Sequence, residues 1–476
     1  MSEALLSLLG SPLKAGPAID RQLAQRLRSA IAAGKVQSGT RLPPSRELAL
    51  QLGIGRNSVV AAYACGVDEG WLAGRGRLGT FVADSAGPRA RKSSSASPGL
   101  PALARRLVSP APTEVPPHAD WRLGQAGTMA LPLRVWRSAC KEAGRHLLPS
   151  GYGDPRGDLA LRQGIARWLL TSRGIDVSAQ QVVVTQGASQ AIERLAALLL
   201  RPGDLCAVEN PGYARAARIF AAAGASILAV AVDAEGAQVD TAFAGPRIPA
   251  LVHLTPAQHY PLGMRLSGPR RAQLLALARR HGTLVLENEY DHEFIPPGPR
   301  HVSLFASAPH QTVLVSTFAK AISPALRLGF VVASASVADR LADAVADERM
   351  QVSWPVQRSV AWLLDSGELE RHLRRVRRQG QRLRDELADP LRRWQERFGL
   401  TAQGGGQHLL LRAFSEKRSR ALQRALQQAG IRFDALETYA SGASPWHGLL
   451  LSYGHMSIAD LRKAVACLEV ALEAVG

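Results

Sequence analysis

Cysteine is scarce in this 476-residue chain, which contains only four. Cys65, Cys140, Cys206 and Cys467 lie far apart and include no CxxC pair. This spacing excludes a zinc-ribbon type of metal site and a dense disulfide framework. Free thiols of this kind are typical of proteins in a reducing compartment.

Long apolar runs are also missing. Stretches such as 195–200 and 284–286 are much shorter than the roughly 18 to 20 residues that span a bilayer. The opening segment MSEALLSLLGSPLKAG has no basic start, no long apolar core and no small-residue cleavage signal. We therefore expect a cytoplasmic protein without a membrane-spanning segment.

Acidic residues are too few to balance the basic ones. The chain has 39 aspartates and glutamates against 58 lysines and arginines, for a formal net charge of +19. Such a charge favours binding to polyanions such as DNA. An arginine-rich genome would give the same excess, so DNA binding also requires a located motif.

Residues 85–118 are rich in proline, serine, alanine and arginine and show no helical or strand period. This composition predicts a basic linker. It separates residues 1–84, enough for one small domain, from residues 119–476, which predict a larger one.

Residues 1–84 predict three helices and a hairpin. The first two helices end near Gly34 and at Gly53, and Ser45 is the expected N-cap of the second. The third is expected over 56–69. Two short strands, 71–74 and 80–83, would flank the loop RGRLG. The apolar positions expected to face inward are Leu23, Leu27, Ile31, Leu48, Leu52, Val59, Tyr63 and Val67.

This order of elements is typical of a winged helix-turn-helix, whose third helix enters the major groove of DNA while the wing lies against the phosphate backbone. The segments RLPPSRELALQLGIGRNSVVAAY and EGWLAGRGRLGTFV resemble the DNA-binding domain of the GntR family. An arginine face that is merely solvated is the alternative. The resemblance implies phosphate or base contacts by Arg46, Arg56, Asn57 and Ser58, and a wing that includes Arg75, Arg77, Gly79 and Thr80.

Gly66 departs from the family, which usually has a large apolar residue at this position of the recognition helix. Glycine costs a helix about 1 kcal/mol relative to alanine. We expect a loss of packing in addition.

The remainder of the chain alternates β-branched runs such as QVVVTQ and TLVLENEY with amphipathic stretches of helix length. This alternation predicts an α/β fold with a mainly parallel sheet. The strand VVVTQ ends at Gly187, Ala188 and Ser189, and a helix is expected from Gln190. A glycine turn that opens a helix is a natural phosphate site, although many strand-to-helix turns look the same.

Three further strand ends carry chemically useful side chains, at 209–213, 287–290 and 316–320. Lys320 can form a Schiff base, Tyr213 can stack on a flat ring, and Arg327 can pair with a phosphate. Together they predict a pocket for a cofactor that carries an aldehyde. A lone lysine is more often a solvated surface charge, which is the alternative.

The blocks YGDPRGDLALRQGIARWLLTSRGI, VVTQGASQAIE, VENPGY, LTPAQHYPLG, ENEYDHEF and STFAKAISPALRLGF resemble, in order, those of the MocR family, in which a GntR-like domain is fused to a fold-type-I aminotransferase-like domain. The resemblance implies pyridoxal 5'-phosphate bound to Lys320, with Tyr213 stacked on it and Tyr290 beside its phenolic oxygen. It also implies a homodimer. The residues that it assigns to the phosphate are Gly187, Ala188, Ser189, Thr317, Arg327 and, from the other subunit, Tyr152.

Asn288 stands where the family has an aspartate beneath the pyridine nitrogen. Because side chains alternate along a strand, Asn288 shares a face with Tyr290, while Glu287 and Glu289 point the other way. A carboxylate keeps this nitrogen protonated. An amide, we expect, at best donates a hydrogen bond to an unprotonated nitrogen, so cofactor binding survives while carbanion chemistry weakens.

Other departures concern the phosphate and the substrate. Ala319 replaces a common serine, and Leu450 stands where the family can carry an arginine for a substrate carboxylate. Arg215, two residues after Tyr213, is retained and could bind an anionic group of an effector. His259 is equally compatible with a place near the ring edge and with a local structural role.

The favoured interpretation is a transcriptional regulator that binds double-stranded operator DNA and senses pyridoxal phosphate or a small amine or amino acid. An aminotransferase with an accessory DNA-binding domain is the main alternative. A repressor with an empty C-terminal domain would leave the coincidence of Lys320, Tyr213 and Arg327 unexplained.

Overall fold

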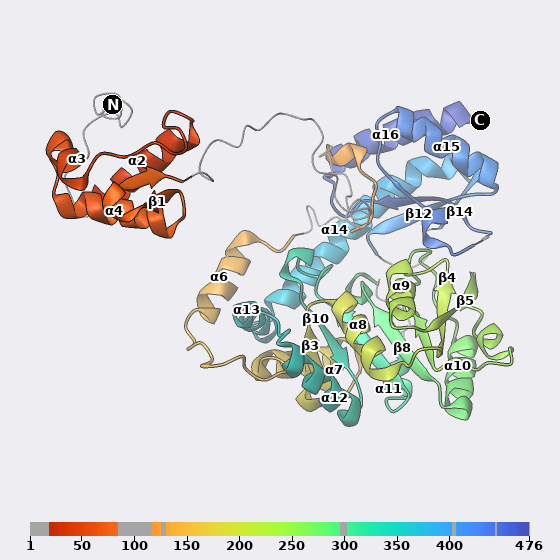
Figure 1. Cartoon of the computed structure of the whole chain (residues 1–476). Helices are drawn as coiled ribbons and strands as arrows, with labels where there is room; N and C mark the ends of the chain where they lie inside the picture. The colour runs from red at the N-terminus through yellow and green to blue at the C-terminus, as the bar shows by residue number, and fades with distance from the viewer. Residues whose placement is uncertain are drawn as a thin grey trace. The chain divides into compact units, whose positions relative to one another are not determined.

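The computed structural model describes residues 19–83, 116–124, 130–295, 302–401, 406–442 and 445–475. The chain divides into two compact units, Met1–Pro112 and Thr113–Gly476 (Figure 1). Most of the expected linker, residues 85–118, lies outside the described residues. None of the described helices is sufficiently long and apolar to cross a membrane.

Within residues 19–83, the N-terminal unit contains three α-helices and a two-stranded antiparallel hairpin, as the sequence predicts. Leu23, Leu27, Ile31, Leu48 and Val59 lie in its buried core. The elements are α2 (Ile19–Ala32), α3 (Ser45–Leu52), α4 (Arg56–Asp68), β1 (Leu72–Gly74), η1 (Gly76–Leu78) and β2 (Thr80–Val82).

Two expected details of these helices are wrong. Pro44 occupies the N-cap of α3, so Ser45 is the first helical residue and its side chain makes no capping hydrogen bond. Val67 is 41% exposed. The buried stripe of α4 follows Ala62 and Gly66 at four-residue spacing, and Val67 lies one residue, about 100° of helix turn, beyond it.

Gly66 is buried against the hairpin. A Cβ atom at this position would lie 2.6 Å from Cδ1 of Leu72 and 2.9 Å from Cη2 of Trp71. The expected loss of packing is therefore wrong, because Trp71 and Leu72 fill the space that a larger residue at position 66 would occupy.

The second unit is built on an eight-stranded sheet with strand order β3-β10-β9-β8-β7-β4-β5-β6. The pairs β4–β5, β4–β7, β7–β8 and β8–β9 are parallel, while β10 runs antiparallel to both β3 and β9. The strands are β3 (Val182–Thr185), β4 (Leu205–Asn210), β5 (Ser226–Asp233), β6 (Gly236–Ala237), β7 (Leu251–Leu254), β8 (Leu284–Glu289), β9 (Thr312–Thr317) and β10 (Gly329–Val332).

Helices cover both faces of this sheet. Val182 and Val184 of β3 pack in one cluster with α7 and α13, while Val183 packs in another with α8 and α9. This alternation explains why the sequence of β3 is apolar at successive positions. The helices are α6 (Leu133–Ala143), α7 (Leu159–Arg173), α8 (Ala188–Leu199), α9 (Ala214–Ala222), α10 (Gly268–His281), α11 (Leu304–Ser307), α12 (Ala335–Glu348) and α13 (Trp354–Asp365).

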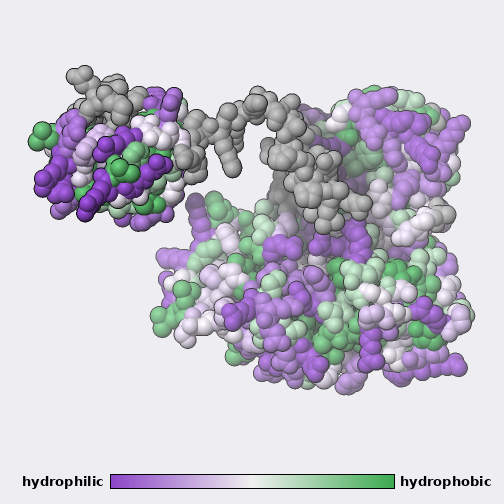
Figure 2. Space-filling view, in the orientation of Figure 1, coloured by the Kyte–Doolittle hydropathy of each residue, from purple (hydrophilic) through white to green (hydrophobic). Residues whose placement is uncertain are grey.

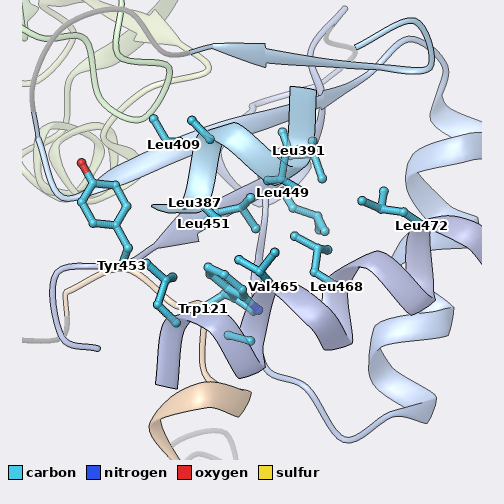
Figure 3. Close-up of a cluster of buried hydrophobic side chains, with 14 of the residues drawn as sticks. Trp121, Leu387, Leu391, Leu409, Leu449, Leu451, Tyr453, Val465, Leu468 and Leu472 are labelled. Carbon is cyan, nitrogen blue, oxygen red and sulfur yellow. The ribbon is translucent and has the colours of Figure 1, made fainter. Parts of the chain in front are cut away.

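A four-stranded antiparallel sheet, ordered β11-β12-β14-β13, forms the C-terminal part of this unit. Leucines of the strands and helices surround Trp121, which comes from the start of the unit (Figure 3). The elements are α14 (Glu368–Leu391), β11 (Phe398–Thr401), β12 (His408–Ala413), α15 (Glu416–Gln428), β13 (Asp434–Ala435), β14 (His447–Ser452) and α16 (Ile458–Val475).

Short 3-10 helices connect several of these elements. They are η3 (Pro117–Ala119), η4 (Ala179–Gln181), η5 (Val239–Phe243), η6 (His292–Phe294), η7 (Pro324–Leu326), η8 (Arg392–Trp394) and η9 (Leu436–Tyr439).

The direction of the strands determines where functional side chains gather. Because β10 is antiparallel to both β3 and β9, those two strands run the same way, as do β8, β7 and β4. The carboxyl ends of these strands therefore meet at one edge of the sheet, which is the usual place for a ligand in α/β proteins.

Candidate functional site

A cavity of about 330 Å³ lies at this edge of the sheet. Its wall also includes Leu123, Gln407, His408 and Tyr439, which come from segments outside the large sheet. The predicted cofactor residues that line it are Gly187, Ala188, Ser189, Tyr213, Asn288, Tyr290, Thr317, Lys320 and Arg327.

The predicted phosphate turn connects β3 to α8. Gly187 is the N-cap with a φ of 83°, and α8 begins at Ala188, two residues before the expected start. The first turn of a helix has backbone N–H groups without intrahelical partners, and these can bind an anion. A Cβ atom on Gly329 of β10 would lie 2.9 Å from Cα of Gly187, so only glycine allows this close approach.

Thr317 and Arg327 flank the lysine in the sequence and line the same cavity. The hydroxyl group of Thr317 donates to the carbonyl of Leu328 at 3.2 Å and accepts from the N–H of Ala319 at 3.1 Å. Arg327 is exposed and has a φ of 48°. This left-handed conformation, uncommon for a residue other than glycine, ends η7 beside the cavity.

Lys320 and Asp291 both line the cavity. Burial lowers the pKa of Lys320 below its usual value, and the nearby Asp291 opposes that effect. A lowered pKa increases the fraction of neutral amine, which is the form that attacks an aldehyde. Burial also raises the pKa of Asp291 well above its usual range, with Lys320 opposing. Sequence reasoning missed Asp291, although it directly follows Tyr290 in a recognised block.

Tyrosine side chains form one wall of the cavity. The hydroxyl groups of Tyr213 and Ser189 are 3.2 Å apart. Tyr260, which sequence reasoning missed, meets Tyr213, Tyr290 and Tyr439 edge to face, with ring centroids 5.7, 5.1 and 5.5 Å away. The wall is therefore aromatic with polar tips, which suits a flat ring with polar substituents.

Asn288 and Tyr290 line the cavity, while the glutamates between and before them face elsewhere. Glu287 accepts hydrogen bonds from Ser303 and from backbone N–H groups of α11, and Glu289 pairs with Arg173. This confirms the prediction that Asn288 and Tyr290 share one face of the strand while the two glutamates lie on the other. Within the described residues, Oδ1 of Asn288 and the hydroxyl group of Tyr290 are buried without a hydrogen-bond partner.

Orphaned polar atoms of this kind are costly, and a ligand that supplies their partners offsets the cost. The lysine, the helix N-terminus, the aromatic wall and these two atoms fit the aldehyde, phosphate, ring and ring substituents of pyridoxal phosphate.

Several predicted residues lie outside this cavity. Tyr152 is 66% exposed, and its ring lies 5.1 Å from the guanidinium carbon of Arg349. Arg215 lies in a separate hollow beside Arg218 of α9, so the structure does not bring it to an effector in the main cavity. Because α9 begins directly after Tyr213, Arg215 lies on a different face of the chain from that ring.

His259 and Leu450 are both buried away from the cavity lining. Nδ1 of His259 accepts from the N–H of Leu262 at 3.3 Å, and burial lowers the pKa of this imidazole to about 3. The structure thus favours the structural role for His259. Leu450 packs in an apolar cluster with Leu410 and Trp446.

The N-terminal unit exposes the side chains predicted to contact DNA. Arg46 is exposed at the start of α3, and Arg56 and Asn57 are exposed at the start of α4. Ser58 is half-buried. The visible face of this unit in Figure 2 is largely hydrophilic. These positions are compatible with contacts to a DNA backbone and groove.

The predicted wing is the β1–β2 hairpin. Arg75 and Arg77 are exposed, and the guanidinium carbon of Arg75 lies 4.9 Å from the centroid of the Phe81 ring. Gly79 has a φ of 105°, and a Cβ atom there would lie 3.2 Å from Nε of Arg41. Arg41, which sequence reasoning missed, forms a bridge to Phe81 and adds a cation to the wing.

Comparisons with known proteins agree with this two-part architecture. The family "Bacterial regulatory proteins, gntR family" matches residues 19–82, and "Aminotransferase class I and II" matches residues 122–466. The alpha-aminoadipate aminotransferase LysN of Thermus thermophilus shares the fold, with a TM-score of 0.68 and 23% identity over 75% of this chain and 92% of that one.

Two regulators match nearly the whole chain. The probable rhizopine catabolism regulatory protein MocR of Rhizobium meliloti is 30% identical over 96% of this chain and 94% of its own length. The pyridoxine biosynthesis regulator PdxR of Corynebacterium glutamicum is 31% identical over 94% of each. The chain therefore belongs to the aminotransferase class I and II family and to its MocR-type transcriptional regulators, which join a gntR-family helix-turn-helix to an aminotransferase-like domain.

Proposed function

We propose that this regulator binds pyridoxal phosphate through Lys320 and that occupation of the cavity changes its affinity for operator DNA. The observation that carries the proposal is the gathering of Lys320, Tyr213 and Arg327 around one cavity in a chain that begins with a helix-turn-helix unit. Coupling between the two requires that the ligand and the DNA each bind one of two arrangements of the protein better than the other.

Each part of the cavity has a separate role in this proposal. When bound, pyridoxal phosphate supplies an aldehyde and an electron-withdrawing ring. The amine of Lys320 would hold the aldehyde, and the N–H groups at the start of α8 would hold the phosphate together with Arg327. Tyr213 would cover the ring face, and Tyr290 would donate to the phenolic oxygen. Thr317 keeps the turn before Lys320 in place through its two backbone contacts.

The cavity favours an amine without a carboxylate, or pyridoxal phosphate itself, as the effector. Among the described lining residues, the basic side chains are Lys320, Arg327 and His408. Burial lowers the pKa of His408 to about 4, so this imidazole is neutral at pH 7. Lys320 and Arg327 are already assigned to the cofactor. The pyridoxine biosynthesis role in the name of the PdxR relative supports pyridoxal phosphate as the ligand.

We also propose a homodimer that acts on double-stranded operator DNA in the cytoplasm. Leu147 and Leu148 are 94% and 72% exposed in the segment that precedes Tyr152. A second subunit would cover this apolar surface and bring Tyr152 toward the phosphate of its partner. Sedimentation should give about twice the 50.9 kDa of one chain. A monomer that retains the cofactor would contradict the shared site.

The central test compares the natural protein with Lys320→Ala, using the exposed Lys463→Ala as a matched control. Pyridoxal phosphate should give visible absorbance and, after borohydride reduction, a mass adduct in the natural protein and the control but not in Lys320→Ala. Affinity for the operator should respond to the cofactor only in the first two proteins. An adduct that persists on another lysine would refute the assignment.

The alternative of a working aminotransferase is favoured by one observation, the likeness of the second unit to enzymes such as LysN. Turnover of an amino acid by the purified protein, without any response of operator binding to the cofactor, would favour that alternative.

A further inference from the structure

His253 and Asn288 face each other on neighbouring parallel strands, β7 and β8. Nδ2 of Asn288 lies 3.3 Å from Nε2 of His253, and both residues are buried. The Asn288 amide lines the cavity, whereas His253 lies behind it. The imidazole can therefore determine whether Oδ1 or Nδ2 of Asn288 points into the cavity.

The protonation state of His253 follows from its surroundings. Burial lowers the pKa of this imidazole to about 4, and a hydrogen bond to the residue's own backbone only partly opposes that effect. The ring is therefore neutral at pH 7 and carries one proton. Because Nε2 faces Asn288, the nitrogen that reaches its own backbone carbonyl is Nδ1, and this nitrogen holds the proton.

Neighbouring rings keep His253 in this orientation. Tyr213 is nearly parallel to it, with ring centroids 6.4 Å apart, and Phe220 packs against it at 5.9 Å. Nε2 then offers only a lone pair, so Asn288 must donate to it through Nδ2. The reversed amide would place two acceptors, Oδ1 and Nε2, against each other.

The carbonyl end of Asn288 is left without a partner. Oδ1 is buried, and within the described residues it has no hydrogen bond. We infer that His253 orients Asn288 so that Oδ1 accepts a hydrogen bond from a protonated ring nitrogen of the bound cofactor. This reverses the expectation from sequence, in which the amide donates to an unprotonated nitrogen.

This inference rests on the proposed function, because it requires pyridoxal phosphate in the cavity. It assigns His253 as a positioning residue and Asn288 as the cofactor contact. Other titratable groups that line the same cavity include Tyr290, Asp291 and Lys320. His253 acts on the cavity through the amide of Asn288, with which it is in direct contact.

The experiment uses the full chain loaded with pyridoxal phosphate labelled with ¹⁵N in its ring. The chemical shift of this nitrogen reports directly whether it carries a proton. We expect the protonated position in the natural protein and in Asn288→Asp. Asn288→Leu should move the resonance to the unprotonated position and weaken cofactor binding about tenfold, because one hydrogen bond is lost.

His253→Phe tests the positioning role with Asn288 intact. Without the acceptor at Nε2 the amide is free to reverse, and we expect the resonance to move toward the unprotonated position while visible absorbance persists. His253→Leu is the second variant if the phenylalanine disturbs folding, since leucine likewise offers Asn288 no acceptor.

The outcomes separate this inference from the proposed function. Visible absorbance with an unprotonated ring nitrogen in the natural protein would overturn the inference and leave cofactor binding intact. A protonated nitrogen that persists unchanged in Asn288→Leu would also overturn it, since the proton would then be held by another group. Absence of any bound cofactor would refute the proposed function and the inference together.

Discussion

Glu209 accepts two hydrogen bonds from Thr255, one from its backbone N–H at 2.9 Å and one from its hydroxyl group at 2.7 Å. Burial nevertheless raises the pKa of Glu209 from 4.5 to about 8. Between these two values the folded protein holds a proton that the unfolded chain has lost. The contribution of this group to stability is therefore complete below the unfolded pKa and is lost as the pH rises through the folded pKa.

We expect Glu209→Gln to remove the contribution of this carboxyl group to the pH dependence of stability. The free energy of unfolding of the natural protein should fall relative to that of the variant between about pH 5 and pH 8. Urea denaturation at several pH values measures the difference, and Glu235→Gln, at an exposed site, is the control. If the free energy of unfolding changes with pH in the same way in the natural protein and in Glu209→Gln, then Glu209 is ionised in the folded state.

DNA binding should depend on the arginines at the starts of α3 and α4. Arg56→Ala is expected to cost about 1 to 3 kcal/mol on a specific operator if this side chain reads a base. Replacing Arg46 and Arg56 together should also make the dependence of affinity on salt shallower, because fewer counterions are released. Arg424→Ala, an exposed arginine on α15, changes the charge elsewhere and serves as the control. Equal operator affinity for the double variant and the natural protein would contradict this placement.

The loaded protein should transaminate α-amino acids poorly. Leu450 is buried among apolar residues and leaves a substrate carboxylate without a bidentate contact worth about 1.5 to 3 kcal/mol, or one to two powers of ten in affinity. Asn288, being neutral, also holds a proton on the ring nitrogen less strongly than a carboxylate would. Conversion of bound pyridoxal phosphate to pyridoxamine phosphate can be followed by absorbance in the natural protein and in Asn288→Asp. Rapid, complete conversion by an ordinary α-amino acid in the natural protein would favour the alternative of a working aminotransferase.

Gly66→Leu should loosen the N-terminal unit. The substitution gains about 1 kcal/mol of helix propensity, but overpacking of a filled core costs typically about 1 to 3 kcal/mol. Because the new Cβ atom would lie 2.6 Å from Leu72 and 2.9 Å from the rigid ring of Trp71, the cost should prevail. Hydrogen exchange of α4 should then accelerate, whereas Ala64→Leu on the exposed face of the same helix should have little effect. Slower exchange in Gly66→Leu would show that Trp71 and Leu72 can move to accommodate the larger side chain.

Sequence patterns predicted those site residues that follow directly on strands. Gly187, Asn288 and Lys320 each lie within a few residues of a strand end, and the common direction of the strands brings them together. Strand alternation also separated Asn288 and Tyr290 from the intervening glutamate.

The remaining wall of the cavity could not be predicted in this way. Leu123, His408 and Tyr439 belong to segments without a recognisable pattern, and only the packing of the C-terminal sheet brings them to the cavity. The position of Arg215 depends on the residue at which α9 begins. The two-residue spacing between Tyr213 and Arg215 does not reveal that residue. Ser45 was misassigned for a similar reason, since Pro44 already supplies the extended conformation that precedes a helix.

The contact of Gly329 with Gly187 has a consequence for how the regulator responds. With no side chain between β10 and the phosphate turn, the turn is preorganised by the sheet before any ligand arrives. Little conformational entropy is then spent on ordering it, which favours tight binding. We therefore expect a structural response to a ligand to arise elsewhere in the lining, at Tyr439 and His408, which the C-terminal sheet and the segments beside it contribute.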